Sequence, residues 1–478
     1  MQRVRRVYTV CLFIVMASID NTVLGLLPAL TPRLRAEFNI SDAWLGAAIG
    51  VNLVVVAITA LLWGYRGDQG DRRWLLICGT LAWALPVALV PLSARFSVLF
   101  GLIVLAGIGL GCISTVGYSI ITDLVPQRWR GLILGLWGLA QGIGGLVGIQ
   151  LAASSASWRE PFGWMAAVGV ACSGLALFAI APRKGQADEA LRALDEVDAT
   201  YEYRIQPADL PLMLARPSNR WLILQGFVAQ FTFGSLTLLV VLLTAKLVSA
   251  GLPNDLASRV AAQLLVVLQL GGVISLAWGW AGDRLQQRWP RIRALLAAYG
   301  FWAAIPCYML LFWMPLPTPA DTSGGALQIV MQQLGRNPWW ALALLAATLA
   351  TIAQATNAPN WYALVCEVNL PEHRGTAFSF ITFANNIGRA IGAILVASTF
   401  GWLGQQFPAP INYALGLTLF QLFFIPAGLC FWLAARTTQR DAADVQATLA
   451  QRAAAMVARA HEHSAPVRPD IDPTQAAV

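Results

Sequence analysis

The chain has 478 residues, of which 57% are hydrophobic and only 12% charged, with a mean hydropathy of +0.62. Soluble domains carry about 25% charged residues, so this composition excludes an ordinary soluble domain and indicates a membrane protein. The net charge of +8 does not indicate a nucleic-acid partner, because the basic residues lie in short segments between apolar stretches and not on an aromatic-rich basic helix.

Twelve apolar stretches are long enough to cross a membrane, because a spanning helix needs about 20 mostly apolar residues. They predict an all-α integral membrane protein whose transmembrane helices form two six-helix halves. In chain order the stretches are 7–31, 42–64, 74–93, 97–122, 131–155, 161–181, 220–247, 257–280, 291–314, 339–364, 375–402 and 411–435.

The polar segments divide the chain into four predicted parts. These are an N-terminal half at 1–181, a charged linker at 182–219, a C-terminal half at 220–435 and a tail at 436–478. We expect a short surface helix in the linker, an amphipathic turn at 327–334 within the long loop 315–338, and an amphipathic helix near 441–460 before a disordered end.

Basic residues alternate in density from loop to loop. The positive-inside rule then places the linker and both termini in the cytoplasm, as an even number of spans requires. The start of the chain, Met1–Arg6, leads directly into a long apolar stretch without a small-residue cleavage pattern, so we expect a first spanning helix and not a cleaved signal peptide. The predicted location is the cell (inner) membrane.

A charged turn occurs twice. The segment Trp63–Trp74 returns 215 residues later, in altered form, as Trp278–Trp289. A second pair, Asp123–Gly131 and Glu367–Gly375, is separated by 244 residues, and the extra loop 315–338 accounts for the larger offset. Two such pairs indicate a duplicated membrane unit.

These turns resemble the major facilitator superfamily, whose loop between helices two and three reads roughly G-x-x-x-D-[RK]-x-G-[RK]-[RK]. The matching positions are Gly64, Asp68, Arg72 and Arg73 in the first copy and Gly279, Asp283, Arg284 and Arg288 in the second, with P-x-x-R-G turns at Arg130 and Arg374. The resemblance implies transport by alternating access, with helices one, four, seven and ten lining the cavity.

The beginning of the chain is similar to the spinster branch of that superfamily. Ile40–Gly46, followed by Gly64–Asp68, matches its I-S-D-x-x-x-G and G-Y-L-G-D pattern, and Asp20 falls where the branch has an acidic residue in helix one. Two positions depart from the branch. Asn21 stands where it usually has Arg, and Leu110 where it has a Glu in helix four.

Asp20 is the only acid, and Arg389 the only base, deep in a predicted span. Such groups are expensive in a bilayer, so their default interpretation is functional. Asp20 is a candidate for proton coupling, for contact with a substrate cation, or for a structural ion pair. Arg389 is a candidate ligand for an anionic substrate group or a partner of Asp20 in one state of the cycle; a buried structural pair is the alternative.

Further polar side chains lie on helices that the resemblance places around the cavity or share a face with Arg389. Tyr118 and Tyr362 occupy equivalent positions in the repeat. Hydrogen bonding between packed helices is the competing explanation for the amides. The remaining candidates for the cavity are Asn21, Gln230, Gln354, Asn357 and Asn386.

The charged turns suggest a gate. Asp68 and Asp283 are predicted to lie near N-termini of helices of the other half, where partial positive charge favours a carboxylate. The arginines of these turns serve either the gate or only membrane topology.

The sequence therefore predicts a secondary transporter, with a lipid-like or amphiphilic anion as favoured substrate through the spinster resemblance and protons as a candidate coupling ion. The alternatives are an exporter of polar metabolites or drugs, and a non-transporting membrane sensor or receptor of the same fold. No P-loop, metal cluster or nucleophile constellation is recognisable, so we expect no enzyme and no cofactor. The expected partners are a small molecule and the lipid bilayer, and the expected state is a monomer.

Overall fold

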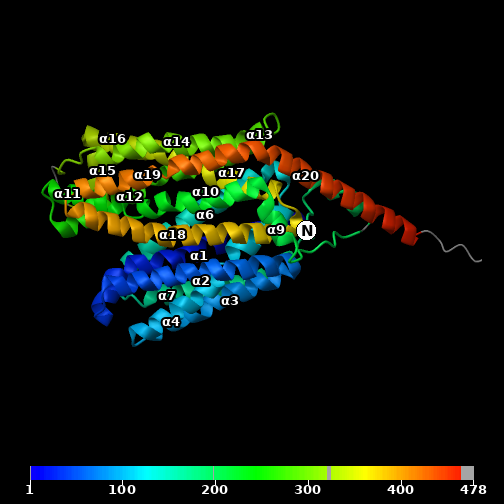
Figure 1. Cartoon of the computed structure of the whole chain (residues 1–478). Helices are drawn as coiled ribbons and strands as arrows, with labels where there is room; N and C mark the ends of the chain where they lie inside the picture. The colour runs from blue at the N-terminus through cyan, green and yellow to red at the C-terminus, as the bar shows by residue number, and fades with distance from the viewer. Residues whose placement is uncertain (1, 198, 320–323, 465–478) are drawn as a thin grey trace, which may run out of the picture.

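The structure is a computed structural model that describes residues 2–197, 199–319 and 324–464, and this part of the chain is helical with no strand. Uninterrupted helices are expected of an apolar chain, because in a bilayer every backbone polar group must be satisfied within the protein. The helices run roughly side by side as two groups, the first from blue to cyan and the second from green to red (Figure 1).

The first group covers the expected N-terminal half. Helix α1 packs against α6, α3 against α4 and α7, and α2 against α4. The elements are α1 (Gln2–Phe38), α2 (Asp42–Gln69), α3 (Arg72–Leu89), η1 (Val90–Leu92), α4 (Phe96–Leu110), the π-helical η2 (Ile113–Gly117), α5 (Tyr118–Leu124), α6 (Gln127–Ser154) and α7 (Glu160–Ala176).

The second group covers the expected C-terminal half. Helix α10 packs against α18 and α20, and α14 against α16 and α20. The elements are α10 (Pro217–Leu236), α11 (Leu239–Ser249), α12 (Asn254–Leu268), η4 (Leu270–Ile274), α13 (Ser275–Gln286), α14 (Ile292–Trp313), α15 (Ala326–Arg336), α16 (Pro338–Gln354), α17 (Asn357–Glu367), η5 (Pro371–His373), α18 (Arg374–Gly404), α19 (Ile411–Gln421) and α20 (Phe424–Ser464).

Eleven helices in the described residues are long and apolar enough to cross a membrane. The expected sixth span corresponds to α7, which has 17 residues and, at about 1.5 Å per residue, is slightly shorter than a hydrocarbon core of about 30 Å. The count of twelve therefore stays a prediction. Several spans are interrupted midway, for example between α10 and α11 and between α16 and α17, which the uniform apolar pattern did not reveal.

The linker and the chain ends lie together. The N-terminus, α9 (Asp209–Ala215) and the protruding end of α20 occupy the same end of the bundle (Figure 1), which we call the linker end; α11 and α15 mark the far end. The linker also contains η3 (Glu189–Leu191) and α8 (Ala193–Glu196). The tail helix is not separate, because α20 continues without a break to Ser464. The expected disordered end, 465–478, lies outside the described residues.

Helices α1 and α6 approach closely through glycine. A Cβ atom on Gly144 would lie 2.0 Å from the backbone oxygen of Ser18, and one on Gly148 would lie 2.3 Å from that of Thr22. Small residues that allow backbones to touch are typical of helix packing in membranes. One turn away on the same helix, a Cβ on Gly142 would meet nothing within 4 Å.

We expect Gly144→Ala to destabilise the protein and Gly142→Ala to leave it unchanged or slightly more stable. The added methyl of the first variant must push α1 away from α6, at a cost of about 1–3 kcal/mol, whereas the second gains helix propensity without a clash. Thermal unfolding of the purified variants in detergent measures the difference. Equal melting temperatures would show that the two helices have room to separate freely.

Candidate functional site

The carboxylate of Asp68 joins the two halves at the linker end. Asp68 lies in the last turn of α2 and is fully buried. It accepts hydrogen bonds from the backbone N–H groups of Gly375 (3.0 Å) and Thr376 (2.6 Å), and from the Thr376 hydroxyl (2.8 Å). These donors open helix α18, so the carboxylate sits at a helix N-terminus, where partial positive charge stabilises it.

Asp283 makes the equivalent contact in the opposite direction. From α13 it accepts hydrogen bonds from the N–H groups of Gly131 and Leu132, both at 2.9 Å, in the second turn of α6. The two contacts are unequal. Leu132 has no hydroxyl to match that of Thr376, and Asp283 instead has an ion pair with Arg293 at 2.6 Å. Both carboxylates therefore contact a helix of the other half, and their role as a gate stays a prediction.

Two further ion pairs support these carboxylates from within each half. Arg72 at the start of α3 contacts Asp123 at 2.6 Å, and Arg293 in the first turn of α14 contacts Glu367 at 3.2 Å. The sequence repeat contained Asp123 and Glu367 as landmarks but did not mark them as gate residues. It also aligned Arg73 with Arg288, so the structural counterpart of Arg72, which is Arg293, was missed.

The other predicted arginines of the turns lie apart from these contacts. Arg284 and Arg288 are exposed, and the guanidinium of Arg284 lies 5.6 Å from the Trp280 ring. Arg73 lies over Trp74 at 5.8 Å and points toward the Leu177 carbonyl. Their placement near aromatic rings at the end of the bundle agrees with the alternative that they specify topology.

A linker carboxylate connects the two halves a third time. Asp188 contacts Arg130 of α6 at 2.8 Å and Arg374 of α18 at 2.8 Å, and the two arginines hold equivalent positions in the repeat. Burial alone would raise the pKa of Asp188, but the Arg374 and Arg130 guanidiniums outweigh it and lower the pKa to about 2. We call these three residues the arginine clamp. Asp188 was not predicted.

The linker is held in place by the end of α20. Leu191, Leu194 and Tyr201 pack with Leu449 and its neighbours in a small apolar cluster separate from the main core. The Tyr201 hydroxyl donates to Glu372 at 3.0 Å and accepts from Arg452 at 2.7 Å, and Arg452 also pairs with Glu372. The tail helix thus positions the linker segment that carries Asp188.

Aromatic rings from both halves meet above the gate. The Tyr118 ring lies 4.6 Å from Trp137 of its own half, and 4.5 Å and 4.7 Å from Tyr362 and Phe378 of the other. Tyr118 is buried and shares a hydrogen bond of 3.2 Å with Gln141. Tyr118 and Tyr362, expected in the cavity wall, therefore form with these rings an aromatic layer that closes the interface between the halves.

A cavity of about 410 Å³ lies between α6 and the C-terminal helices. Two of the predicted residues, Gln354 and Asn357, line it; Asn357 also accepts a long hydrogen bond, 3.5 Å, from Gln225. Most of the remaining wall is apolar. It includes Gly138, Leu139, Gly142, Ile143 and Leu146 of α6, and Leu236, Leu265 and Leu268.

Arg389 lies halfway along α18 and is exposed, although the other side chains around it are at least partly buried. Its Nε donates to Gln230 of α10 at 3.2 Å, and its charge interacts with the Tyr362 hydroxyl. Asn386 and Asn21 donate to backbone carbonyls of their own helices. The structure therefore brings Arg389, Gln230 and Tyr362 together.

Asp20 lies elsewhere, inside the N-terminal half. It is buried near Trp83 of α3 and within electrostatic range of Cys112 and Cys172. Within the part of the chain that the structure describes, its Oδ2 has no hydrogen-bond partner and its carboxylate has no ion pair. The pair between Asp20 and Arg389 that one state of the cycle was expected to show is not formed here.

Comparison with known proteins identifies the protein family. Residues 9–335 match the family model described as the Major Facilitator Superfamily. Protein spinster of Drosophila melanogaster is 26% identical over 317 residues, which are 64% of this chain and 50% of that protein. Multidrug resistance protein MdtL of Citrobacter koseri is 29% identical over 170 residues, covering 34% of this chain and 41% of that protein.

Among solved structures, a bacterial homologue of the human lysosomal transporter Spinster, inward-facing and unoccupied, has a TM-score of 0.58 and 18% identity, covering 91% of this chain and 98% of that one. This likeness shows that the two chains share a fold. The chain belongs to the major facilitator superfamily, and its similarity to spinster proteins confirms the resemblance found in the sequence. It spans about half the length of the curated spinster protein that it matches.

We expect Asp188→Asn to loosen the linker end. Removing the shared charge leaves buried Arg130 without an ion pair and Arg374 with only its 3.3 Å contact to Asp123. Breaking a buried pair typically costs about 3–5 kcal/mol. Cys366 is fully buried beside the gate, so its alkylation reports opening. The rate of Cys366 alkylation should rise by about tenfold or more in Asp188→Asn. The matched control is Glu189→Gln, because Glu189 pairs only with Arg192 on the exposed linker surface.

Alkylation of buried Cys172 distinguishes opening from unfolding, because it lies in α7 away from the gate. The clamp should also be insensitive to pH across the neutral range. A carboxylate whose folded pKa is about 2 stabilises the fold above the unfolded value of about 3.9 and loses this effect only as the pH falls toward 2. Identical Cys366 rates in the two variants would contradict the clamp.

Proposed function

We propose that the protein is a secondary transporter for an amphiphilic anion, that it works by alternating access, and that protons drive it through Asp20. The linker end is then cytoplasmic and holds both termini, the membrane is the cell (inner) membrane, and the structure represents a state closed to the cytoplasm. The observation that carries the proposal is the set of contacts that Asp68, Asp283 and Asp188 form between the halves at the linker end.

These contacts suit a gate because they are short and confined to one end. Asp68 and Asp283 each contact a helix of the other half near its start, and Asp188 pairs with one arginine of each half. A small rocking motion of one half therefore separates these contacts together. The separated groups become hydrated, which offsets the lost hydrogen bonds, and the two states can then differ by only a few kcal/mol. An apolar interface alone would not provide polar contacts that break together at one end.

The substrate class is inferred from what lies beyond the aromatic layer. Arg389 is an exposed guanidinium in mid-membrane, held by Gln230, and a planar guanidinium is well suited to a carboxylate or phosphate. The cavity beside α6, whose lining does not include Arg389, has mostly apolar walls on α6 and α12, which suit an alkyl chain. The combination of one cation and apolar walls supports an amphiphilic anion. The similarity to spinster proteins supports the same branch of transporters.

A drug exporter is the second candidate. It is favoured by the apolar wall formed by Leu139, Ile143 and Leu146, which could hold a neutral or cationic drug without Arg389, and by similarity to the MdtL multidrug resistance protein. The two candidates differ in whether they need the Arg389 charge, and this difference can be measured.

We expect Arg389→Gln to reduce uptake of dodecyl phosphate into proteoliposomes by about tenfold or more, because a charge-assisted hydrogen bond contributes roughly 1.5–3 kcal/mol. Uptake of dodecyltrimethylammonium is the comparison. Arg259→Gln is the matched control, since Arg259 is exposed and pairs only within its own helix. Wild-type uptake of dodecyltrimethylammonium but not of dodecyl phosphate, unchanged by Arg389→Gln, would favour the drug exporter. Binding without flux in the wild type would indicate a sensor.

We expect Asp20→Asn to abolish the dependence of uptake on a proton gradient. An ionised carboxylate is costly in a buried site that lacks a cation, so Asp20 is suited to exchange a proton during the cycle. Gradient-driven and counterflow uptake should be compared in the same proteoliposomes, with Asp255→Asn as an exposed control. Counterflow that persists while the gradient response disappears is the expected outcome. An unchanged gradient response would remove Asp20 from coupling.

A further inference from the structure

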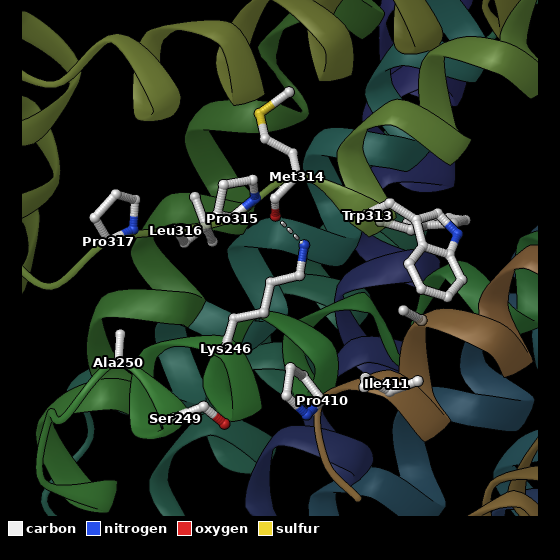
Figure 2. A pocket seen from close by; sticks show the side chains of 12 residues that line it. Lys246, Ser249, Ala250, Trp313, Met314, Pro315, Leu316, Pro317, Pro410 and Ile411 are labelled. Atoms are coloured by element: carbon white, nitrogen blue, oxygen red, sulfur yellow. Dashed lines mark hydrogen bonds between the residues drawn. The ribbon is translucent and has the colours of Figure 1, made fainter. Parts of the chain in front are cut away.

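A buried lysine lies at the far end of the C-terminal half, away from the gate. Leu311, whose carbonyl it contacts, also lines the cavity beside α6. Lys246 is in the last turn of α11 and has only 8% of its surface exposed. Its ammonium donates to the backbone carbonyls of Leu311 (3.1 Å) and Met314 (2.6 Å), where α14 ends. Figure 2 shows the ammonium bonded to the Met314 carbonyl, with Pro315 on one side of this bond and Trp313 on the other.

These two bonds leave part of the charge uncompensated. An ammonium has three N–H donors, of which two are used here. The end of helix α14 contributes partial negative charge equivalent to about half an electron, which is less than the charge of the ammonium. Among the described residues, no carboxylate forms an ion pair with Lys246, and the nearby acid Asp255 is paired with Arg259. The site therefore keeps a net positive charge in a low-dielectric setting.

The lysine lies in a pocket of about 390 Å³ with mostly apolar walls. Trp313 and Ile411 are both exposed and stand on its rim, and the indole N–H of Trp313 bonds Thr418 at 3.0 Å. Exposed tryptophan at the end of a span is typical of the membrane interface. The other walls come from Phe312, Met314, Pro315, Leu316, Pro317, Pro410 and Ala414 (Figure 2 shows most of them).

We propose that this pocket binds the anionic headgroup of a membrane amphiphile from the leaflet at the far end. The remaining N–H of Lys246 meets a phosphate or carboxylate oxygen, and the alkyl chain leaves along Trp313 and Ile411 into the bilayer. The site is separate from Arg389 and from the cavity beside α6, and it does not depend on which substrate is transported. A basic pocket between helices is a general form of headgroup site.

The shared chemistry is an oxyanion, which a lipid headgroup or free phosphate could supply. The apolar walls favour the amphiphile, because a hydrated inorganic ion gains nothing from contact with Leu316 or Trp313, whereas an alkyl chain gains about 0.8 kcal/mol per buried methylene. The two sources can therefore be distinguished by competition.

Native mass spectrometry of the full chain in a neutral maltoside detergent tests the site, with phosphatidylglycerol and phosphatidylcholine as probes. The wild type should retain phosphatidylglycerol in preference to phosphatidylcholine. Lys246→Met, which keeps the apolar stem, should weaken retention by about tenfold. Lys246→Arg should restore it, because Arg keeps the charge and can donate to the same carbonyls. Arg259→Gln should have no effect, because Arg259 is exposed and lies in α12, the helix that follows α11.

Lys246→Met also leaves two carbonyls unpaired, so its melting temperature must be measured alongside. If this variant is unstable, the conclusion rests on Lys246→Arg. Retention that falls with Arg389→Gln instead would move the bound lipid to the central cavity and overturn the proposal. Equal retention by Lys246→Met and the wild type would do the same. Displacement by millimolar inorganic phosphate would assign the site to a free anion and reject the amphiphile.

Discussion

The structure depends on a carboxylate placed at the N-terminus of a helix that belongs to the other half. Asp68 holds the start of α18 and Asp283 the start of α6. Asp283 contacts N–H groups one turn into α6 and stabilises the interface between the halves. Asp68 satisfies backbone N–H groups that a helix leaves unpaired, so it stabilises a helix end as well as the same interface. Because these donors exist only at a helix end, the contact is fixed in register and confined to one end of the bundle.

That position determines what the rest of the interface can do. The aromatic rings of Tyr118, Tyr362 and Phe378 pack together only while the helix starts remain docked, because the rings lie on the same helices or on their neighbours. The cavity beside α6 lies beyond the rings. A closed end and an open interior thus follow from where helices begin.

The sequence predicted the parts of this design that are repeated and local. The duplicated turn identified Asp68 and Asp283, and apolar length identified the spans, because both signals lie within short segments. Asp188 was not predicted because it is one of several linker acids, and only its distance from Arg130 and Arg374 in the folded chain distinguishes it. Arg293 escaped because it stands at a different offset from its counterpart Arg72. The orientation of Asp20 toward Trp83 depends on helix rotation, which a uniformly apolar span does not encode.

Asp188 also explains why the linker should matter to a motion that takes place in the membrane. The linker is the covalent connection between the halves, and any rocking motion must move its ends relative to each other. Asp188 pairs with one arginine from each half, so its charge lies between the two surfaces that such a motion would separate. The cluster of Tyr201, Glu372 and Arg452 then ties the same linker to α20. The tail helix, which continues directly from the last span, therefore contacts the linker segment that carries Asp188. The linker and the tail thus add to the asymmetry that the unequal contacts of Asp68 and Asp283 already give the two halves.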